Sequence, residues 1–429
     1  MLISFNFSNL YSFRDETQFS MQAAEDIVTH ASSVLHLPDG EGEVNVLPMA
    51  AIYGGNAAGK TNFTLALRIL KQCVLSQTLT GITPFLLCSE NSGQSCLEVC
   101  FANKDHVYNY KLVIGLNHII DGDPFAYWVA SEELKDVTGN EEKCLFRRIP
   151  GLTFETDALA DVSEPERDRL KKMDPQKVLL AYLAEQFGEV LSPCVEWFRD
   201  VLTLVPAGAT SVLFAVKLLQ DKEAFARELN MADTSISRLD LREMPGAAQM
   251  VPQETLEKFK ESSSNVMASY GDDSTFFLKD EKGNVHGKTC ISTHVAPDGR
   301  SVSFPLGLES DGSRKYMQLL PFLLERDSYV IVVDEIDRSL HPYLMALLTR
   351  RFRQSVVEGA RKQLIFTTHD VLLMKDNELR KDEIWLVNRG RDDASQMRSY
   401  YDYQETGDGS DALEDYLAGH VGGLPSIEW

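Results

Sequence analysis

The sequence predicts an α/β fold organised around a phosphate-binding loop, and three observations support this prediction. First, a Gly/Ala-rich stretch fits the pattern G-x-x-x-x-G-K-[ST]. It reads Gly54-Gly55-Asn56-Ala57-Ala58-Gly59-Lys60-Thr61. Second, an apolar run at 46–53 enters this stretch and a helical pattern leaves it, which is the context that the motif requires. Third, the β-branched run at 329–333 is typical of a central parallel strand.

Composition indicates a globular protein larger than one ordinary domain. The chain has 429 residues, of which 44% are apolar and 25% charged, and this is enough to build a core. A net charge of −22 argues against a surface that coats nucleic acid broadly, although a local basic groove stays open. The most apolar long stretch, 202–219, is interrupted by proline, glycine and lysine, so we expect no membrane span. Residues 1–5 resemble a strand rather than a signal peptide, so we expect a cytoplasmic protein.

The seven cysteines have irregular spacing and include no C-x-x-C pair. Cys88, Cys96 and Cys100 are near enough in sequence to suggest zinc. The alternation of apolar and polar residues around Cys96 and Cys100 favours packing in a strand instead. We therefore expect reduced thiols, mostly in the core.

Residues 1–150 are expected to form the first part of the nucleotide-binding unit, with an inserted antiparallel β subdomain. Besides the strand before the loop, strands are expected at 2–7, 17–21, 95–103, 106–116, 124–134 and 143–148. The helix after the loop should extend to about Ser76. Residues 24–45 carry few periodic apolar positions and should form a loop.

Residues 151–270 are expected to form a helical insertion. Helical spacing covers 177–187, 195–204, 210–230 and 253–268, and a short strand is expected at 236–243. Apolar residues do not follow a sustained heptad pattern, so the sequence does not predict a long coiled-coil arm.

Residues 271–429 are expected to complete the nucleotide-binding unit. The expected elements are a small β region at 271–306, a helix at 314–325, a strand at 329–333, a helix at 343–357, strands at 363–367 and 383–388, and a short final helix. Pro321 lies inside the first helix and should produce a kink or an early end there.

The phosphate-binding loop has the residue types that nucleotide chemistry needs. Glycines let backbone N–H groups approach phosphate oxygens, and the N-terminus of the following helix adds partial positive charge. Lys60 can reach the β- and γ-phosphates, and the hydroxyl of Thr61 can hold Mg²⁺. The alternative, a turn that caps an ordinary helix, is disfavoured by the flanking strand and helix. The predicted nucleotide-binding residues of the loop are Gly54, Asn56, Ala57, Ala58, Gly59, Lys60, Thr61 and Asn62.

Two carboxylates end the strand at 329–333. Ligands of open α/β sheets bind beyond the carboxyl ends of strands, and Asp334 and Glu335 stand at such an end. Asp334 can hold Mg²⁺ through water opposite Thr61, and Glu335 can accept the proton of an attacking water or orient it. A solvated strand end is the alternative, and the intact phosphate-binding loop argues against it.

A histidine ends the strand at 363–367 in the same way. His369, in Thr367-Thr368-His369-Asp370, can hydrogen-bond the γ-phosphate and so report its presence. The predicted catalytic residues are therefore Lys60, Glu335 and His369.

A second helix N-terminus can bind an anion. Ser310-Asp311-Gly312-Ser313 stands directly before the helical pattern at 314–325, so the free N–H groups of the first turn are available. On this stretch alone, Ser313 would be an ordinary N-cap.

The order of these elements resembles that of ABC-type ATPase heads over nearly the whole chain. It is most similar to the standalone bacterial ABC/SMC-like ATPases, which include RloA, the abortive-infection ATPases and the ATPase half of overcoming-lysogenisation-defect nucleases. Asn9-Leu10-Tyr11-Ser12-Phe13 resembles their N-F-x-S-F start, and 309–313 resembles E-S-D-G-T. The tail at 416–419, with Gly422 and Pro425, is also similar. The most specific match is Asp334-Glu335-Ile336-Asp337 running into Ser339-Leu340-His341-Pro342.

This resemblance implies an ABC-type P-loop head and a dimer that sandwiches ATP and Mg²⁺. The nucleotide would lie on one subunit and be closed by the second helix N-terminus of the other. The subunit that carries the nucleotide would contribute Lys60, Thr61, Asp334 and Glu335. The other subunit would contribute Ser310, Gly312 and Ser313. Asp337 would take the family's D-loop role. Such ATPases gate or scaffold an effector, often a nuclease, in prokaryotic defence against phage, so we expect a homodimer or higher homo-oligomer with a separate effector protein.

Other features set limits on the resemblance. The second helix N-terminus is not L-S-G-G-Q, which disfavours a transporter ATPase. No Q-loop glutamine can be placed, although Gln94 lies in about the right region. The missing heptads argue against an SMC-type tether. The segment after His369 is too short for an appended nuclease domain of ordinary size, so an effector would act in trans.

Two other functions stay open on the sequence. A DNA-repair ATPase of the RecF type would act directly on DNA and would be stimulated by DNA with a strong salt dependence. The acidic balance of the chain argues against it. A non-hydrolysing scaffold would use ATP only to lock an assembly, and the substitution Glu335→Gln would then change little.

Overall fold

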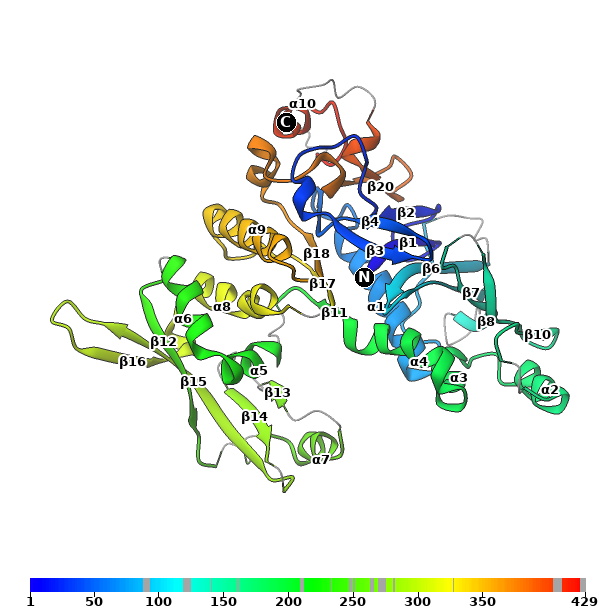
Figure 1. Ribbon diagram of the computed structural model, residues 1–429, viewed down its shortest axis with the longest axis horizontal. Helices are drawn as coiled ribbons and strands as arrows, with labels where there is room; N and C mark the ends of the chain where they lie inside the picture. Colours follow the sequence, from blue (N-terminus) through cyan, green and yellow to red (C-terminus); the bar gives the residue numbers. More distant parts are fainter. Residues whose placement is uncertain are drawn as a thin grey trace. The chain divides into compact units, whose positions relative to one another are not determined.

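The chain folds into two compact units in the computed structural model (Figure 1). Unit 1 comprises Met1–Leu204, Asp327–Ile336 and Val356–Trp429, and unit 2 comprises Val205–Arg326 and Asp337–Ser355. The residues that the structure describes are 1–87, 93–118, 125–139, 141–159, 162–208, 212–232, 234–246, 249, 251–262, 266–268, 275–280, 282–326, 328–403 and 411–424. Cys88 and Pro425, both named in the sequence analysis, and the start of the expected β region, 271–274, lie outside them.

A six-stranded sheet in unit 1 has the order β11-β17-β18-β5-β19-β20. Its strands are β5 (Met49–Gly54), β11 (Leu202–Val205), β17 (Tyr329–Val333), β18 (Lys362–Thr367), β19 (Ile384–Arg389) and β20 (Ser395–Ser399). The pairs β17–β18, β18–β5 and β5–β19 are parallel. Every residue of β5 and of β18 is buried. This explains the continuous apolar sequence of β5, whereas β18 buries the polar residues Lys362, Gln363 and Thr367 as well. The strands predicted before the loop and at 329–333, 363–367 and 383–388 are confirmed.

A second sheet in unit 1 is antiparallel, with the order β10-β9-β8-β7-β6-β1-β2. Its strands are β1 (Leu2–Ser8), β2 (Thr17–Ser20), β6 (Gln94–Asn103), β7 (His106–His118), β8 (Phe125–Asp136), β9 (Lys143–Ile149) and β10 (Thr153–Glu155). The predicted β subdomain is thus continuous with the N-terminal strands. The helix α1 (Lys60–Ser76) buries its apolar face, including Phe63, Leu67 and Leu70, in one core with residues of both sheets.

The prediction of a loop at 24–45 is wrong. This segment contains the antiparallel hairpin of β3 (Leu35–Asp39) and β4 (Gly42–Val46). Its alternation is short and interrupted by Pro38, which hides it in the sequence. Residues 24–29, which come before this hairpin, are held in place by buried Arg380. Its guanidinium donates to the carbonyl oxygens of Ala24, Ile27 and Thr29 at 2.9–3.2 Å.

Residues 151–204 pack within unit 1, so the compact units do not follow the expected boundaries at 151 and 271. This segment contains α2 (Glu164–Lys172), α3 (Leu180–Gln186), α4 (Gly188–Glu196) and the π-helix η2 (Trp197–Val201). The helix predicted at 195–204 is wrong beyond Val201, because β11 joins the parallel sheet there. Two buried side chains hold the segment to the antiparallel sheet: Arg148 donates to the carbonyl oxygens of Met173, Asp174 and Lys177, and Glu132 accepts from the N–H groups of Leu179 and Leu180.

Unit 2 contains both helices and strands. The strand predicted at 236–243 and the β region predicted at 271–306 are confirmed within it. Its sheet has the order β12-β15-β14-β13, and β16 also pairs with β15. The strands are β12 (Ile236–Glu243), β13 (Val266–Ala268), β14 (Thr275–Lys279), β15 (Val285–Val295) and β16 (Ser301–Pro305). The helices are α5 (Val212–Gln220), α6 (Lys222–Met231), α7 (Gln253–Glu261), α8 (Asp311–Leu324) and α9 (Pro342–Val357), the last of which continues into unit 1.

Three helix predictions in this region need correction. The helix predicted at 210–230 is two helices, because Asp221 caps α6 by accepting a hydrogen bond from the Ala224 N–H. The helix predicted at 253–268 ends at Glu261 and is followed by β13. The early end expected at Pro321 does not occur, since α8 continues to Leu324.

The tail contains the predicted short helix, α10 (Ala412–Ala418). Among the described helices, no segment has both the length and the apolar character needed to cross a membrane.

Candidate nucleotide-binding site

Three neighbouring parallel strands bring the predicted phosphate, metal and catalytic residues of unit 1 to one edge of the sheet. The phosphate-binding loop follows β5, His369 follows β18, and Asp334 and Glu335 follow β17. Because β17, β18 and β5 are adjacent and parallel, their carboxyl ends meet at this edge.

The loop has a backbone shape that only glycine permits at its last position before the helix. Gly59 has a φ of 117°, and a Cβ there would collide with Ser395 Oγ and lie 2.9 Å from Ser12 Oγ. Ala57 also has a positive φ, 61°, which is uncommon for a residue with a side chain. Asn56 and Ala57 are exposed, so the outer part of the loop is accessible to a ligand.

Ser395 and Ser12 support the loop on the side that faces away from solvent. The hydroxyl of Ser395 donates to the Ala58 carbonyl oxygen at 2.5 Å and hydrogen-bonds Ser12 Oγ at 2.7 Å. Asn62 Nδ2 donates to the same Ser12 Oγ at 2.8 Å. Asn62, predicted as a nucleotide-binding residue, therefore also helps to hold the loop. Ser395 was missed by the sequence analysis because β20, which has few apolar residues, was not predicted.

The side chain of Lys60 is buried and folds back onto the start of the phosphate-binding loop. Its ammonium donates to the carbonyl oxygens of Gly54 and Gly55 at 2.7 and 3.2 Å, and the residue is only 7% exposed. These bonds hold one positive charge within the loop, next to its exposed residues Asn56 and Ala57, where phosphate oxygens would bind.

Asp334 joins the loop to the neighbouring strand ends. The hydroxyl of Thr61 donates to Asp334 Oδ2 at 3.0 Å, and the hydroxyl of Thr367 donates to Asp334 Oδ1 at 2.6 Å. Thr367 Oγ1 also accepts from the N–H of Glu335 at 2.7 Å. Glu335 is half-buried and has a φ of 50°. The role of Thr367 was missed, although the residue belongs to the strand end that the sequence analysis quoted.

His369 lies in an exposed turn at the same edge of the sheet. The hydroxyl of Thr368 accepts from the N–H of Asp370 at 2.9 Å, and the Tyr53 hydroxyl donates to the Asp370 carbonyl oxygen at 3.2 Å. These bonds tie the turn after β18 to the strand that enters the phosphate-binding loop.

A cavity of about 430 Å³ adjoins the loop. It is lined by Tyr11, Ser12, Ala57, Asn62, Thr83, Pro84, Phe85, Leu86, Leu87, Arg389 and Asp393. Hydrogen bonds from Tyr11 to the carbonyl oxygens of Thr83 and Gly81, at 2.7 and 3.0 Å, shape one wall. Burial raises the pKa of Tyr11, so its phenol stays a hydrogen-bond donor. The mostly apolar lining, with a few polar groups, suits a planar base and a sugar.

The remaining predicted residues belong to unit 2. Ser310 is the N-cap of α8, since its hydroxyl accepts from the Ser313 N–H at 3.1 Å, so the capping role considered for Ser313 belongs to Ser310. Gly312 allows a close approach, because a Cβ there would lie 2.9 Å from the Ser339 carbonyl oxygen. The start of α8 thus packs against the segment that begins at Asp337, whose carbonyl oxygen accepts from Leu340.

Gln94, considered for a Q-loop, begins β6 in the antiparallel sheet. Its carbonyl oxygen accepts from Asn9 Nδ2 at 2.8 Å. It does not stand at a strand end of the parallel sheet.

A parallel sheet with a phosphate-binding loop, a strand-end Asp–Glu pair and an antiparallel sheet built on the N-terminal strands define an ABC-type P-loop ATPase head. The chain belongs to the family described as "AAA domain, putative AbiEii toxin, Type IV TA system", which matches residues 49–375.

Solved structures of SMC heads are also similar to this chain. The SMC head bound to the C-terminal winged-helix domain of ScpA shares 13% identity, with a TM-score of 0.42, and the match covers 93% of this chain and 97% of that one. The SMC head domain from Thermotoga maritima shares 14% identity, with a TM-score of 0.38 and coverage of 93% and 98%. The Pyrococcus furiosus SMC head with an extended coiled coil, bound to the C-terminal domain of ScpA, shares 12% identity, with a TM-score of 0.38 and coverage of 93% and 96%. A search of curated proteins gave no match.

Proposed function

We propose that this protein binds and hydrolyses Mg-ATP, that two copies close around the nucleotide, and that this cycle gates a separate effector in defence against phage. The observation that supports the proposal best is the bond between Thr61 of the phosphate-binding loop and Asp334, at 3.0 Å, with Glu335 as the next residue. It places the hydroxyl at the end of the phosphate-binding loop against Asp334, which would be the second residue to hold Mg²⁺.

The hydrolytic step would need positioning rather than covalent catalysis. A water molecule would attack the γ-phosphorus, and Glu335 would accept a proton from this water as the new bond forms. The bond between the γ-phosphorus and the ADP oxygen would break in the same step. Lys60 would exchange its bonds to two loop carbonyl oxygens for bonds to phosphate oxygens, and its charge would offset theirs. His369 would donate to a γ-phosphate oxygen.

The donor chemistry of the site fits a magnesium ion. A threonine hydroxyl and an aspartate carboxylate are hard oxygen groups of the kind that Mg²⁺ prefers. Thr61 and Asp334 would hold the ion. When bound, it would neutralise charge on the β- and γ-phosphates.

The cavity beside the loop would receive the nucleoside. It shares Ala57 and Asn62 with the loop, so a base placed there would lie next to phosphates on the loop. Tyr11 and Phe85 would supply aromatic contact area, and Ser12 and Asp393 would supply polar groups.

A second copy would close the nucleotide with the start of its α8. This helix has 14 residues, and its exposed N-cap, Ser310, leaves first-turn N–H groups that can meet a γ-phosphate. Gly312 and Ser313 would contribute at the same point, and Asp337 would lie beside them because Gly312 packs against Ser339.

An effector in trans fits the family description, which refers to a toxin of a toxin–antitoxin system. We infer that the partner is a separate protein. The products of adjacent genes are the first candidates to test for binding. We further infer a cytoplasmic location, because the site needs ATP and because Cys73, Cys96, Cys100, Cys144, Cys194 and Cys290 are free thiols.

Phosphate release from ATP by the purified full-length chain tests the proposal. Lys60→Ala should lose nucleotide binding and turnover, whereas Glu335→Gln should keep binding and lose about 10²- to 10⁴-fold in kcat. Lys172→Ala, on the exposed surface of α2, is the matched control for loss of a lysine. Wild-type turnover in Glu335→Gln would contradict the proposed chemistry. Stimulation by DNA with a strong salt dependence would instead indicate direct action on DNA.

A further inference from the structure

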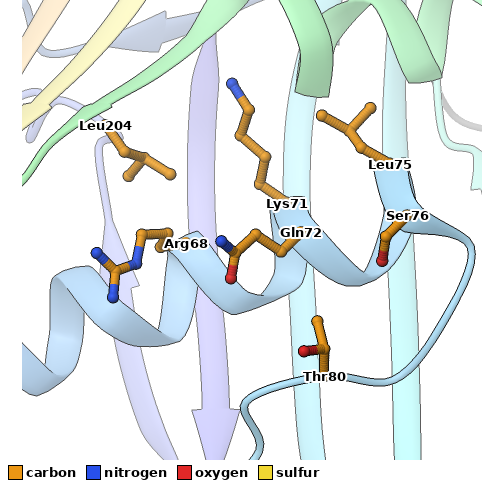
Figure 2. A pocket seen from close by; sticks show the side chains of 7 residues that line it. All are labelled: Arg68, Lys71, Gln72, Leu75, Ser76, Thr80 and Leu204. Atoms are coloured by element: carbon orange, nitrogen blue, oxygen red, sulfur yellow. The ribbon is translucent and has the colours of Figure 1, made fainter. Parts of the chain in front are cut away.

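A cavity of about 540 Å³ lies along the C-terminal half of α1, within unit 1 and apart from the phosphate-binding loop (Figure 2). Arg68, Lys71, Gln72 and Ser76 reach it from α1, and Thr80 from the segment that follows. Figure 2 shows Arg68 and Lys71 projecting from the side of α1 on which Leu204 of β11 lies. None of these residues has a role in the site described above.

The polar side chains that line this cavity are all hydrogen-bond donors. The set contains a guanidinium, an ammonium, an amide and two hydroxyls, and no carboxylate occurs among the described lining residues. In a chain with a net charge of −22, two cations that share a cavity without an acidic lining residue favour a negatively charged ligand.

The guanidinium of Arg68 contains a buried N–H donor, Nε. Its Nε is buried and has no hydrogen-bond partner in the part of the chain that the structure describes. A buried guanidinium N–H without a partner costs free energy, and because Arg68 also lines the cavity, a turn of its side chain toward a bound anion would give this N–H a partner.

Lys71 is a half-buried cation. Its ammonium donates to the Leu202 carbonyl oxygen at 2.5 Å and to that of Arg199 at 3.5 Å, and both acceptors are neutral. Burial lowers the pKa of Lys71, although the charge of Asp200 opposes this shift. Asp200 is itself paired with Arg199 at 3.0 Å. An anion in the cavity would stabilise the charged form of Lys71.

The walls of the cavity also favour an organic body. Leu75 and Leu204, both half-buried, supply apolar surface, and the volume lies in the range of about 300–1,000 Å³ that is usual for small-molecule sites. We propose that this cavity is a second anion-binding site, on the helix that begins at the phosphate-binding loop, and that it takes a small organic molecule carrying a phosphate or a carboxylate.

Titration calorimetry on the full chain tests this proposal, with Lys60→Ala present throughout so that the phosphate-binding loop does not contribute. The probes are phenyl phosphate and benzoate, which share an apolar body and differ in the oxyanion, with inorganic phosphate alongside. At least one organic probe should bind saturably and more tightly than inorganic phosphate. The tighter of the two identifies the source of the oxyanion.

Two substitutions of exposed Gln72 give effects of opposite sign without disturbing the core. Gln72→Glu should weaken binding about tenfold or more, and Gln72→Lys should tighten it, because each places a charge in the cavity. Arg68→Ala should abolish measurable binding. Equal affinities in the two Gln72 variants, or no saturable binding of either organic probe, would overturn the proposal. Since Lys60→Ala already removes the proposed ATPase, failure of either idea leaves the other unaffected.

Discussion

Thr367 and Asp334, at the ends of two neighbouring parallel strands, are joined by a hydrogen bond of 2.6 Å. The same Thr367 hydroxyl accepts from the N–H of Glu335 at 2.7 Å. Thr367 is fully buried, so no water competes for these bonds. One hydroxyl therefore positions both the proposed metal ligand and the proposed base, and it holds Glu335 in its left-handed conformation.

Thr367→Val should separate catalysis from binding. It keeps the shape of the side chain but leaves a buried carboxylate oxygen and a backbone N–H without their partner, at a cost of about 1–3 kcal/mol for each. We expect kcat for ATP to fall about tenfold or more while KM changes little, because the phosphate-binding loop is untouched. Steady-state phosphate release measures both constants.

Thr367→Ser is the control for this prediction, because it keeps the hydroxyl and should restore most of the rate. Equal rates in the valine and serine variants would show that the hydroxyl has no positioning role.

Gly59→Ala should remove nucleotide binding through a collision rather than through backbone conformation alone. Its added Cβ would collide with Ser395 Oγ, which braces the loop at the Ala58 carbonyl oxygen. Gly151→Ala is the matched control, because Gly151 also has a positive φ, 75°, but has no atom within 4 Å of the added Cβ. Fluorescent-nucleotide titration should show at least about tenfold weaker binding for Gly59→Ala only. A similar loss in both variants would point to a general effect on folding.

Glu132 gives a prediction about pH. Its carboxylate is buried and accepts from Tyr110 and from the N–H groups of Leu179 and Leu180. Burial nevertheless raises the pKa of Glu132 above its ordinary value of 4.5. The folded protein therefore binds this proton more tightly than the unfolded chain does. This stabilisation is complete below about pH 4.5 and is lost as the pH rises through the folded-state pKa.

Glu132→Gln cannot ionise, so the variant lacks this pH-dependent contribution. The NH₂ group of the glutamine would also face one of the three hydrogen-bond donors that the carboxylate accepts from, so one bond would be lost. This loss should lower the free energy of unfolding by about 1–3 kcal/mol. Urea unfolding should show that the deficit of the variant is largest near pH 4.5 and shrinks as the pH rises. Glu133→Gln, on the opposite face of β8, is the control and should show no such trend. A deficit that grows with pH would mean that the fold favours the ionised form of Glu132.

Local sequence patterns predicted the elements that carry the proposed phosphate and metal ligands of unit 1. The phosphate-binding loop and the buried strand before Asp334 are marked by a motif and by a β-branched run, and both signals lie within a few residues. The structure places Lys60, Thr61 and Asp334 where these signals indicate.

Residues that support the site from a distance could not be predicted in the same way. Ser395 braces the loop from β20, which is recognisable as a strand only through its pairing with β19. The apolar run of β11 fits a helix or a strand equally well, and its place beside β17 decides between them. The division into two units was also hidden, because buried Glu132 and Arg148 attach 173–180 to the antiparallel sheet through backbone groups that carry no sequence signal.

The mass of the purified protein in solution, with and without Mg-ATP, tests the proposed ATP-sandwich most directly. Wild type, Glu335→Gln and Lys60→Ala would be compared by light scattering at the same protein concentration. We expect Mg-ATP to shift Glu335→Gln to a dimer or a larger species, because the nucleotide is bound and not consumed, and to leave Lys60→Ala unchanged. A monomer in all three proteins with Mg-ATP would contradict a site completed by Ser310, Gly312 and Ser313 of a second copy.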